Sequence, residues 1–568
     1  MARLDRLGPA KAVAQLGATL GREFSSEMLH TVSREDEDTL RQTLHQLIDA
    51  ELLYQRGLPP HATYLFKHAL IQDAAYQSLL KSTRQQYHTQ IAQVLEKRFP
   101  EAIETQPELL AHHYTEAGLV AQAIPYWQQA GQRAAQRSAN MEAISHLTEG
   151  LELLKTLPGT SERAQQELTL QITLGNTLMV AKGYAAPEVE KAYVRARELS
   201  QQAGETPQLF LVLFGLRSHY FVRAELQTAR EVGEQLLTLA QRVQDSALRM
   251  EAYRLQGTTV THLGEFTLAR AYLEKGIALY DPRQHRDHAF LYAQDPGVAG
   301  LSYAALALWY LGYPDQARKR INEALTLARE LSHPFSLAYA LWFAAWLHQH
   351  SREGRAAQER AETTITLSAE QRFPQWLALG AILQGWALAE QGQTEEGIAQ
   401  IQQGLAAFRG TGAELARPYH LALLAEVYGK VGQAEEGLSV LTKALAQMRR
   451  TGERAHEAEL YRLNGELTLQ QFKVQSSRFK VANSQPLIPN PQTEVEAETC
   501  FLKAIEIARR QSAKSWELRA AMSLSRLWQQ QGKKEAARQM LEEIYGWFTE
   551  GFDAKDLQEA KALLEALA

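Results

Sequence analysis

A recurring arrangement of glycine, small and apolar positions runs along most of the chain. A glycine is followed five positions later by a small residue, four further on by an apolar residue, and three further on by another small residue. Copies of this frame begin at Gly118, Gly264, Gly312, Gly392, Gly432 and Gly532. Residues spaced by four and three lie on one face of a helix, and a glycine readily ends the preceding helix in a left-handed conformation. The pattern therefore predicts antiparallel helix pairs, each with its turn at the glycine.

The distance between successive glycines sets the length of the repeat. Gly264 and Gly312 are 48 residues apart, and Gly392 and Gly432 are 40 residues apart. A minimal tetratricopeptide repeat has about 34 residues, so the helices should be extended by about a turn. The frame resembles the tetratricopeptide consensus. It predicts an all-α fold, a tetratricopeptide-like α-α superhelix of about ten helix pairs over residues 105–553.

One repeat is interrupted by an insertion. Leu463 and Gly465 fit the first helix of a pair, but the second helix resumes at Ala497 and Phe501, about 20 residues later than the frame allows. The intervening residues 472–492 are polar and carry three prolines. This composition predicts a flexible surface loop, an expendable insertion in preference to a docking motif.

The first hundred residues follow a different pattern. It predicts helices over Ala10–Leu20, Ser25–Thr31 and Ser33–Leu52, a hairpin of Leu52–Gln55 and Ala62–Phe66 around a Gly57–Pro60 turn, and a long helix from Ala69 towards Lys97. Helices, then a hairpin, then a helix are typical of a winged helix. We therefore predict a winged-helix module over residues 1–104.

Charge argues against binding of DNA by this module. The whole chain has 60 Lys and Arg against 65 Asp and Glu, a net charge of −5, and residues 1–100 hold 12 basic and 11 acidic residues. The helix expected after Ser33 opens with four acidic residues, Glu35 to Asp38. Since phosphate contacts dominate affinity for DNA, an acidic helix start on a neutral domain disfavours it. A winged-helix transcription regulator remains as a second alternative function.

Three runs in the first 80 residues resemble a known family. They are LGREFSSEML (Leu20–Leu29), LIDAELLYQRG (Leu47–Gly57) and FKHALIQDAAYQSLL (Phe66–Leu80). They are similar to bacterial signal-transducing ATPases with helical repeats, of the kind fused to class III adenylate or guanylate cyclases. The resemblance implies a P-loop ATPase before the winged helix and a superhelix after it. It also implies that residues 554–568 are a C-terminal capping helix.

His68 is the residue to which this resemblance assigns a role. Within FKHAL it matches a histidine that senses the nucleotide in related switch ATPases, so it is the candidate cofactor-binding residue. The alternative is a partly buried histidine that caps the helix beginning at Ala69. The alternative is favoured for this chain alone, because the phosphate-binding domain is missing from the sequence.

The chain lacks the motifs of the enzymes that it resembles. It contains neither a P-loop motif nor a cyclase catalytic segment. We therefore expect no catalytic residue and no cofactor, with ATP or ADP relevant only if an ATPase domain lies upstream. Each of the pairs His112–His113, His285–His288 and His348–His350 lacks a third metal ligand at a convincing spacing, so no metal site is predicted. The single Cys500 is expected to be a packed structural thiol in a reducing cytoplasm.

Aromatic residues concentrate in the middle repeats. Most should pack between helices, but a few on the concave side would suit a ligand or peptide. The stretch His288 to Tyr313 is the best candidate for a specificity region. The candidate groove residues are Tyr292, Asp295, Tyr303, Trp309, Tyr310, Trp342, Trp346, Trp376 and Trp386.

These observations favour recognition over catalysis. We interpret the chain as a cytoplasmic, non-catalytic interaction and sensor arm of an ATPase–cyclase type system, which binds a protein, peptide or effector in a concave groove. The partner could be an ATPase or cyclase domain. The longest apolar runs have eleven residues, too few to cross a membrane. The alternative is part of a nucleotide-dependent enzyme whose catalytic domains are upstream or lost.

Overall fold

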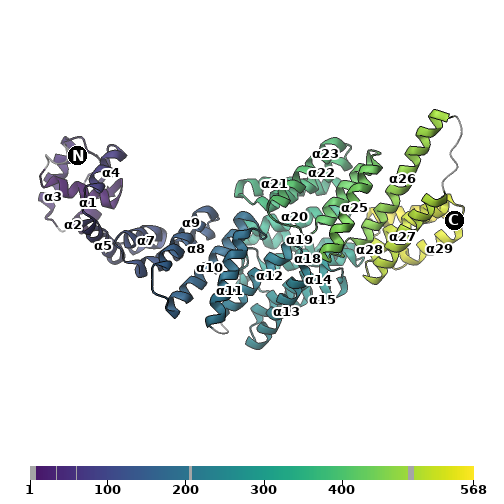
Figure 1. The fold of residues 1–568 in the computed structure, drawn as a ribbon, viewed down its shortest axis with the longest axis horizontal. Helices are drawn as coiled ribbons and strands as arrows, with labels where there is room; N and C mark the ends of the chain where they lie inside the picture. Colours follow the sequence, from purple (N-terminus) through teal and green to yellow (C-terminus); the bar gives the residue numbers. More distant parts are fainter. Residues whose placement is uncertain (1–7, 34, 59–60, 204–206, 484–490) are drawn as a thin grey trace. The chain divides into compact units, whose positions relative to one another are not determined.

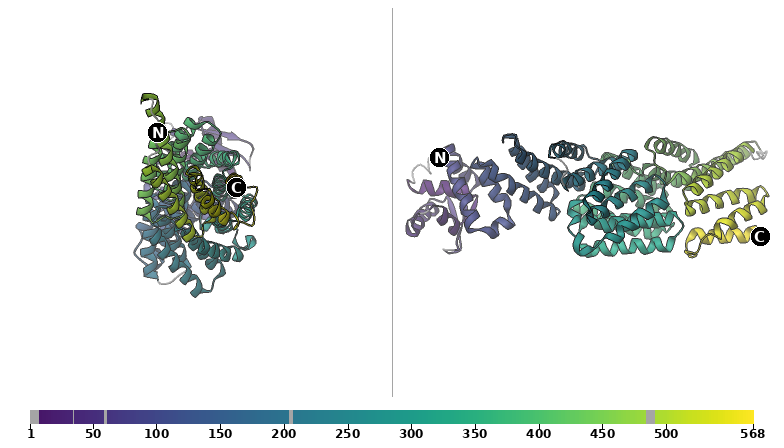
Figure 2. Two further views of the ribbon diagram at one scale, coloured as in Figure 1. Left: turned by 90° about the vertical axis from the view of Figure 1, so that its right-hand side faces the viewer. Right: turned by 90° about the horizontal axis from the view of Figure 1, so that it is seen from below.

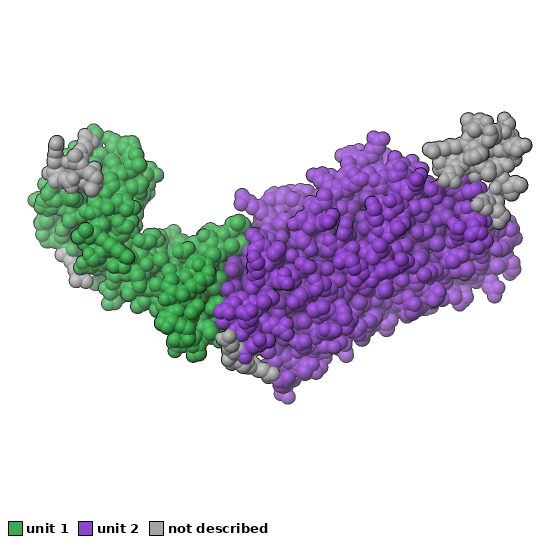
Figure 3. All heavy atoms as spheres, viewed as in Figure 1, with its two compact units in different colours: residues 1–170 green, residues 171–568 purple. Residues whose placement is uncertain are grey.

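The computed structural model describes residues 8–33, 35–58, 61–203, 207–483 and 491–568. Within them the chain forms an all-α superhelix of tetratricopeptide-like helix pairs, preceded by a small module with a three-stranded sheet (Figure 1). The chain divides into two compact units, residues 1–170 and 171–568, coloured separately in Figure 3. No helix among the described residues has both the length and the apolar character that crossing a bilayer requires.

Unit 1 contains the sheet and the first helices. Its elements are α1 (Ala10–Leu20), β1 (Glu23–Ser25), α2 (Ser26–Ser33), α3 (Glu37–Asp49), β2 (Leu53–Arg56), β3 (Thr63–Phe66), α4 (Ala69–Gln77), α5 (Lys81–Arg98), α6 (Pro100–Thr105), α7 (Pro107–Glu116), α8 (Val120–Gln136) and α9 (Asn140–Lys155); α10 (Ser161–Lys182) contains the division between the units. The sheet is antiparallel throughout, in the order β1-β3-β2. The β2–β3 hairpin was predicted, whereas β1 was missed. The expected turn residue Pro60 lies outside the described residues, and the winged-helix classification stays a prediction.

Three predicted helices of unit 1 have different bounds in the structure. The helix expected over Ser25–Thr31 covers Ser26–Ser33 instead, because Ser25 belongs to β1. The helix expected from Ser33 starts at Glu37, because the Asp36 carboxylate accepts a hydrogen bond from the Thr39 N–H at 2.9 Å. The long helix expected from Ala69 is broken into α4 and α5. At the break, the Ser78 hydroxyl donates to the Ala75 carbonyl at 2.6 Å, which competes with continuation of the helix.

Unit 2 is built from successive antiparallel helices that lie side by side (Figures 1 and 2). They are α11 (Pro187–Ala203), α12 (Pro207–Val222), α13 (Leu226–Val243), α14 (Ser246–His262), α15 (Phe266–Leu279), α16 (Pro282–His285), α17 (His288–Leu291), α18 (Pro296–Tyr310), α19 (Pro314–Leu331), α20 (Pro334–His350), α21 (Gly354–Gln371), α22 (Pro374–Glu390), α23 (Thr394–Gly410), α24 (Arg417–Lys430), α25 (Ala434–Thr451), α26 (Glu457–Asn483), α27 (Pro491–Arg510), α28 (Lys514–Gln530), α29 (Lys534–Tyr545) and α30 (Lys555–Leu567).

The repeat glycines and small residues have the roles that their spacing predicts. All six repeat glycines have positive φ values, between 75° and 90°, at the turns between paired helices. Between α22 and α23 the backbones approach so closely that a Cβ on Gly385 would lie 2.7 Å from the Gly397 carbonyl oxygen. Only a residue without a side chain permits this approach, so the small positions fix the packing of the pair.

The superhelix is wound tightly enough for later segments to cover earlier helix ends. The N–H groups of Glu414 and Leu415 donate to the Val222 carbonyl at the end of α12, both at 3.0 Å. In the same way the Arg454 N–H donates to the His262 carbonyl at the end of α14, at 2.8 Å. The Ser515 hydroxyl donates to the Trp309 carbonyl near the end of α18, at 2.5 Å. These contacts join segments about one superhelical turn apart.

This winding corrects the expectation of an open concave groove in the middle repeats. Every residue of α18 is buried, and so are nearly all residues of α20. The aromatic inner face of these helices is covered by the turn that follows it: Trp309 packs against Trp516 with ring centroids 4.8 Å apart, and Trp346 packs against Tyr419 at 5.3 Å. What remains between the turns is an internal cavity.

The insertion also differs from the prediction. Residues 472–483 were expected to belong to a loop, but α26 continues through them to Asn483. The segment contains neither glycine nor proline, so nothing in it ends a helix before Pro486. The rest of the predicted loop, residues 484–490, lies outside the described residues, and Pro491 begins α27.

The close contact between α22 and α23 can be tested with two glycine substitutions. We expect Gly385→Ala to lower the free energy of unfolding by about 1–3 kcal/mol, because the added methyl overlaps the Gly397 backbone. Gly410→Ala, at the exposed end of α23 with no neighbour within 4 Å of the added methyl, should be neutral or slightly stabilising. Urea unfolding followed by circular dichroism measures both. Equal losses for the two variants would contradict the packing account.

Candidate functional site

An internal cavity lies inside unit 2, between the inner helices of one superhelical turn and a segment of the next. Its walls come from α12, α14, α18, α20, α22 and α23, with Leu415, Ala416 and His420 contributed by the following turn. Its volume is about 70 Å³. Sites for drug-sized ligands commonly occupy 300–1,000 Å³, so this cavity suits only a small ligand.

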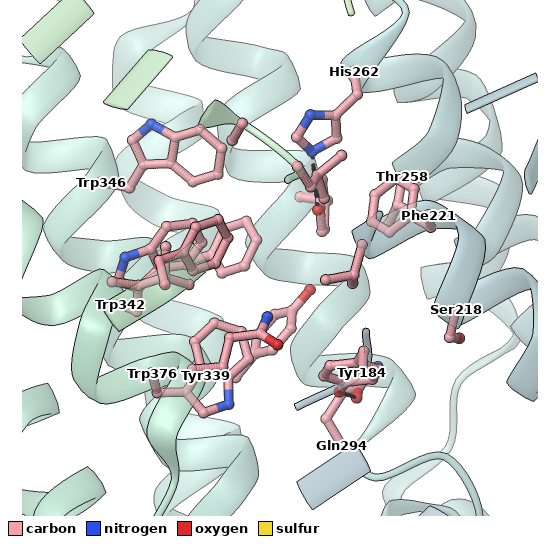
Figure 4. Close-up of a pocket in the computed structure, with 18 of the residues that line it drawn as sticks. Tyr184, Ser218, Phe221, Thr258, His262, Gln294, Tyr339, Trp342, Trp346 and Trp376 are labelled. Atoms are coloured by element: carbon pink, nitrogen blue, oxygen red, sulfur yellow. Dashed lines mark hydrogen bonds between the residues drawn. The ribbon is translucent and has the colours of Figure 1, made fainter. Parts of the chain in front are cut away.

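Aromatic side chains form one wall of the cavity. Trp342, Trp346 and Trp376 lie on one side, with Phe221 and Thr258 across the cavity from them (Figure 4). The rings of Trp342 and Trp346 are 4.7 Å apart because the two residues are one helical turn apart on α20. This wall offers flat apolar surface to whatever occupies the cavity.

Two buried arginines reach the cavity from the opposite helices. Arg254 on α14 pairs with Glu251 on the same helix, with Nε donating to Oε2 at 2.8 Å. Arg217 on α12 is only 2% exposed and makes no ion pair with a carboxylate of the described residues. Burial, together with the charge of Arg254, lowers the pKa of Arg217 to about 9. The cavity wall thus carries one arginine that is not paired with a carboxylate of the described residues.

Several buried polar atoms around the cavity have no hydrogen-bond partner within the described chain. They include the indole Nε1 atoms of Trp342 and Trp376, the side-chain oxygen of Gln375, and both ring nitrogens of His420. Burial lowers the pKa of His420 to about 3, so its imidazole is neutral and offers one donor and one acceptor. Native structures pair nearly all such groups, so their concentration here indicates a site that another molecule completes.

His262 links the cavity wall to the contact between successive superhelical turns. Its Nε2 lies 3.2 Å from the Tyr303 hydroxyl, as marked in Figure 4, and its Nδ1 lies 3.7 Å from a carboxylate oxygen of Glu453. Glu453 in turn accepts a hydrogen bond from the Ala416 N–H at 2.8 Å. The wall of the cavity and the contact between successive turns are therefore one connected network.

The structure places the predicted groove residues in two groups. Tyr303, Trp342, Trp346 and Trp376 line the cavity. The residues buried elsewhere, outside the cavity lining, are Tyr292, Asp295, Trp309, Tyr310 and Trp386. Among these, the Tyr310 hydroxyl is hydrogen-bonded to the Nε2 atoms of both His350 and His456. The Trp386 indole N–H donates to the Glu426 carboxylate at 3.1 Å.

Sequence reasoning missed the polar half of the site. Arg217, Arg254, Gln375 and His420 were not singled out. For Arg217 a signal was present, since it is the single charged residue in the apolar α12 sequence PQLFLVLFGLRSHYFV. The positions of Gln375 and His420 depend on how the superhelix winds, which local sequence does not reveal.

His68 and the other singled-out residues lie away from this cavity. His68 occupies the N-cap position of α4, as the alternative interpretation expected, but it is exposed and its side chain makes no capping hydrogen bond. His113 and His88 share a 2.8 Å contact between their Nδ1 atoms, and burial lowers both pKa values. No cluster of three or more metal-ligating side chains occurs among the described residues. Burial raises the pKa of Cys500, which disfavours a reactive thiolate.

Comparison with known proteins gives distant likenesses. No protein-family model matches the chain. An uncharacterized protein of Rhizobium meliloti (strain 1021) is 23% identical over 431 residues, which cover 75% of this chain and 42% of that protein. The chain thus spans about two fifths of the length of this curated relative.

Three solved structures also resemble the chain. A Rap protein in complex with competence and sporulation factor has a TM-score of 0.47 at 11% identity, covering 68% of this chain and 98% of that one. The Cut9–Hcn1 assembly of the APC/C has a TM-score of 0.44 at 12% identity, and the match covers 88% of this chain and 92% of that one. A signal-transduction ATPase with a tetratricopeptide repeat sensor, from Pyrococcus horikoshii, has a TM-score of 0.29 at 11% identity, covering 98% and 65%.

Asp295 gives a test of how burial changes the pKa of a carboxyl group in this region. Its carboxylate accepts from the Val298 N–H at 2.8 Å and from the Tyr280 hydroxyl at 2.9 Å, and burial raises its pKa to about 6. The folded state therefore binds a proton more tightly than the unfolded state, and this group destabilises the fold as pH rises from about 4 to 6. Asp295→Asn should be more stable than the wild type by about 1–3 kcal/mol at pH 7 and nearly equal to it at pH 3.5. Unfolding at the two pH values measures this, and an equal difference at both would contradict it.

Proposed function

We propose that residues 171–568 form a sensor arm that recognises a small effector inside the cavity and carries out no chemistry on it. The observation that supports this best is the combination of an aromatic wall with buried polar groups that lack partners. An ordinary core would not keep such groups, because each unpaired buried donor or acceptor costs about 1–3 kcal/mol. A ligand that pairs with them recovers that cost on binding.

The position of the cavity suggests how binding is transmitted. Leu415 and Ala416 belong to the superhelical turn that comes after the one containing α12. The Leu415 N–H donates a hydrogen bond to the Val222 carbonyl at the end of α12. A ligand held between the two turns touches both, so it favours the closed winding over a looser one. Binding would thereby change the pitch of the superhelix, and a module attached to it can respond to that change.

We further propose that the attached partner is a signalling ATPase, with or without a cyclase domain. The support is the resemblance carried by Leu20–Leu29, Leu47–Gly57 and Phe66–Leu80, together with a curated relative longer than this chain. In such an assembly the exposed His68 would sense the nucleotide, and ATP or ADP would belong to the ATPase. Deleting residues 171–568 from the assembled protein should change ATPase or cyclase output, and unchanged output would reject this partner.

The sensor function can be tested by filling the cavity. Ser218 on α12 lines the cavity and is buried, and Ser218→Leu places three additional carbon atoms there. A library of common metabolites should contain compounds that raise the melting temperature of the wild type by several degrees and leave that of Ser218→Leu unchanged.

The matched control is Ser332→Leu, at an exposed turn outside the cavity lining. This variant should retain the response of the wild type to each compound. If every active compound shifts the wild type and Ser218→Leu equally, the cavity is not the sensing site.

A further inference from the structure

The uncompensated charge in the cavity identifies the chemical class of its ligand. We infer that the ligand is a small anion, a carboxylate attached to a flat apolar body of about ten non-hydrogen atoms, with Arg217 as its anchor. This inference rests on the proposed function of the cavity. It adds the charge, the size and the anchoring residue.

The contacts of Arg217 explain why an anion would bind next to it. All three of its hydrogen bonds come from Nη2, which donates to the Leu255 carbonyl at 2.6 Å and to the hydroxyls of Thr258 and Thr259 at 2.5 and 2.6 Å. Its Nε is buried without a partner. The guanidinium also lies over the Phe221 ring, 4.1 Å from its centroid. The group is therefore held rigidly by neutral atoms, while part of its donor set stays unused.

The charges near Arg217 do not cancel its own. Arg254 is neutralised by Glu251, which is fully buried and bonded to it through both carboxylate oxygens. The next carboxylate, Glu453, lies beside His262 and accepts from the Ala416 backbone. Arg217 thus has no carboxylate paired with it among the described residues, in a wall where an unpaired charge is strongly disfavoured. A bound carboxylate would supply the missing negative charge and accept hydrogen bonds from the planar guanidinium.

The remaining polar groups of the site fit the same ligand. Trp342 and Trp376 each present an indole N–H without a partner, and an indole can only donate. Together with Arg217, the residues that line the cavity therefore hold more unused donors than acceptors. A carboxylate, which only accepts, matches this excess, whereas an amine or ammonium group does not.

The size and the walls of the cavity define the body of the ligand. Space for water centres of about 70 Å³ corresponds to roughly five waters, or about ten non-hydrogen atoms of a ligand. The rings of Trp342, Trp376 and Phe221 present flat faces to this space. The carboxylate could belong to a free aryl acid or to the C-terminal residue of a short apolar peptide, and the experiment below separates these two sources.

The test compares probes that share a phenylpropyl body and carry an anionic, a neutral or a cationic end group. 3-Phenylpropionate has eleven non-hydrogen atoms and is compared with 3-phenylpropan-1-ol and 3-phenylpropylamine by calorimetry and by quenching of tryptophan fluorescence. We expect the acid to bind the full chain at least about tenfold more tightly than either analogue. A tripeptide ending in Ala-Phe, with a free or an amidated C-terminus, tests the peptide source. Tighter binding of the free peptide than of 3-phenylpropionate would assign the carboxylate to a peptide.

Variants at Arg217 decide whether the preference for the acid comes from this residue. Arg217→Met should fold, because it removes a buried charge, and should bind the acid and the alcohol equally. Arg217→Lys keeps the charge and should retain a weaker preference for the acid. The control is Arg223→Met, an exposed residue paired with Glu225 outside the cavity lining, which should bind as the wild type does.

The outcomes separate this inference from the proposed function. If the alcohol or the amine binds the wild type as tightly as the acid, the ligand is not anionic, but the cavity remains a ligand site. A preference for the acid that survives in Arg217→Met would remove Arg217 as the anchor and overturn the inference. If no probe binds and no metabolite distinguishes the wild type from Ser218→Leu, the inference and the proposed function both fail.

Discussion

Carbonyl groups at the ends of buried helices need hydrogen-bond donors, and in this protein the next superhelical turn supplies them. The last four carbonyls of a helix have no partner within it. At Val222 and His262 the missing donors come from residues 414–415 and 454–455, whereas the Trp309 carbonyl already accepts from the Gly312 N–H and gains a second donor in the Ser515 hydroxyl. Leaving these groups buried and unpaired would cost several kcal/mol in total. The tight winding of unit 2 follows from this requirement.

The turn glycines also affect how closely successive superhelical turns pack. At Gly264 and Gly312 an added Cβ would lie 2.3 Å from the Gln511 amide nitrogen and 2.6 Å from the Trp547 ring, so the following turn packs directly on these positions. At Gly432 and Gly532, nearer the end of the chain, nothing lies within 4 Å. Glycine thus ends the first helix at all four of these turns, but only at Gly264 and Gly312 does it also leave room for the following turn.

The local features of the fold were predictable because they depend on neighbours in sequence. Positive φ at Gly118 and the close approach at Gly385 follow from spacing and residue size alone. The break at Ser78 was missed because the Ser78 side chain competes with the helix for a backbone carbonyl. The continuation of α26 to Asn483 was missed because the polar composition of the segment was given more weight than its lack of glycine and proline. The covering of Trp309 by Trp516 was also missed, because those residues are more than 200 apart.

The candidate site was only half predictable for the same reason. Trp342, Trp346 and Trp376 were found because aromatic residues at helical spacing are visible in one segment. Arg217 and His420 come together only when α12 and α24 are brought to the same cavity by the winding. The charge of Arg217 destabilises that closed arrangement, whereas the hydrogen bond from Leu415 to Val222 stabilises it. These two effects oppose each other at one point of the fold, so the proposed anion, by neutralising Arg217, would also favour closure. Under the proposed function, recognition and winding are therefore expected to form a single equilibrium.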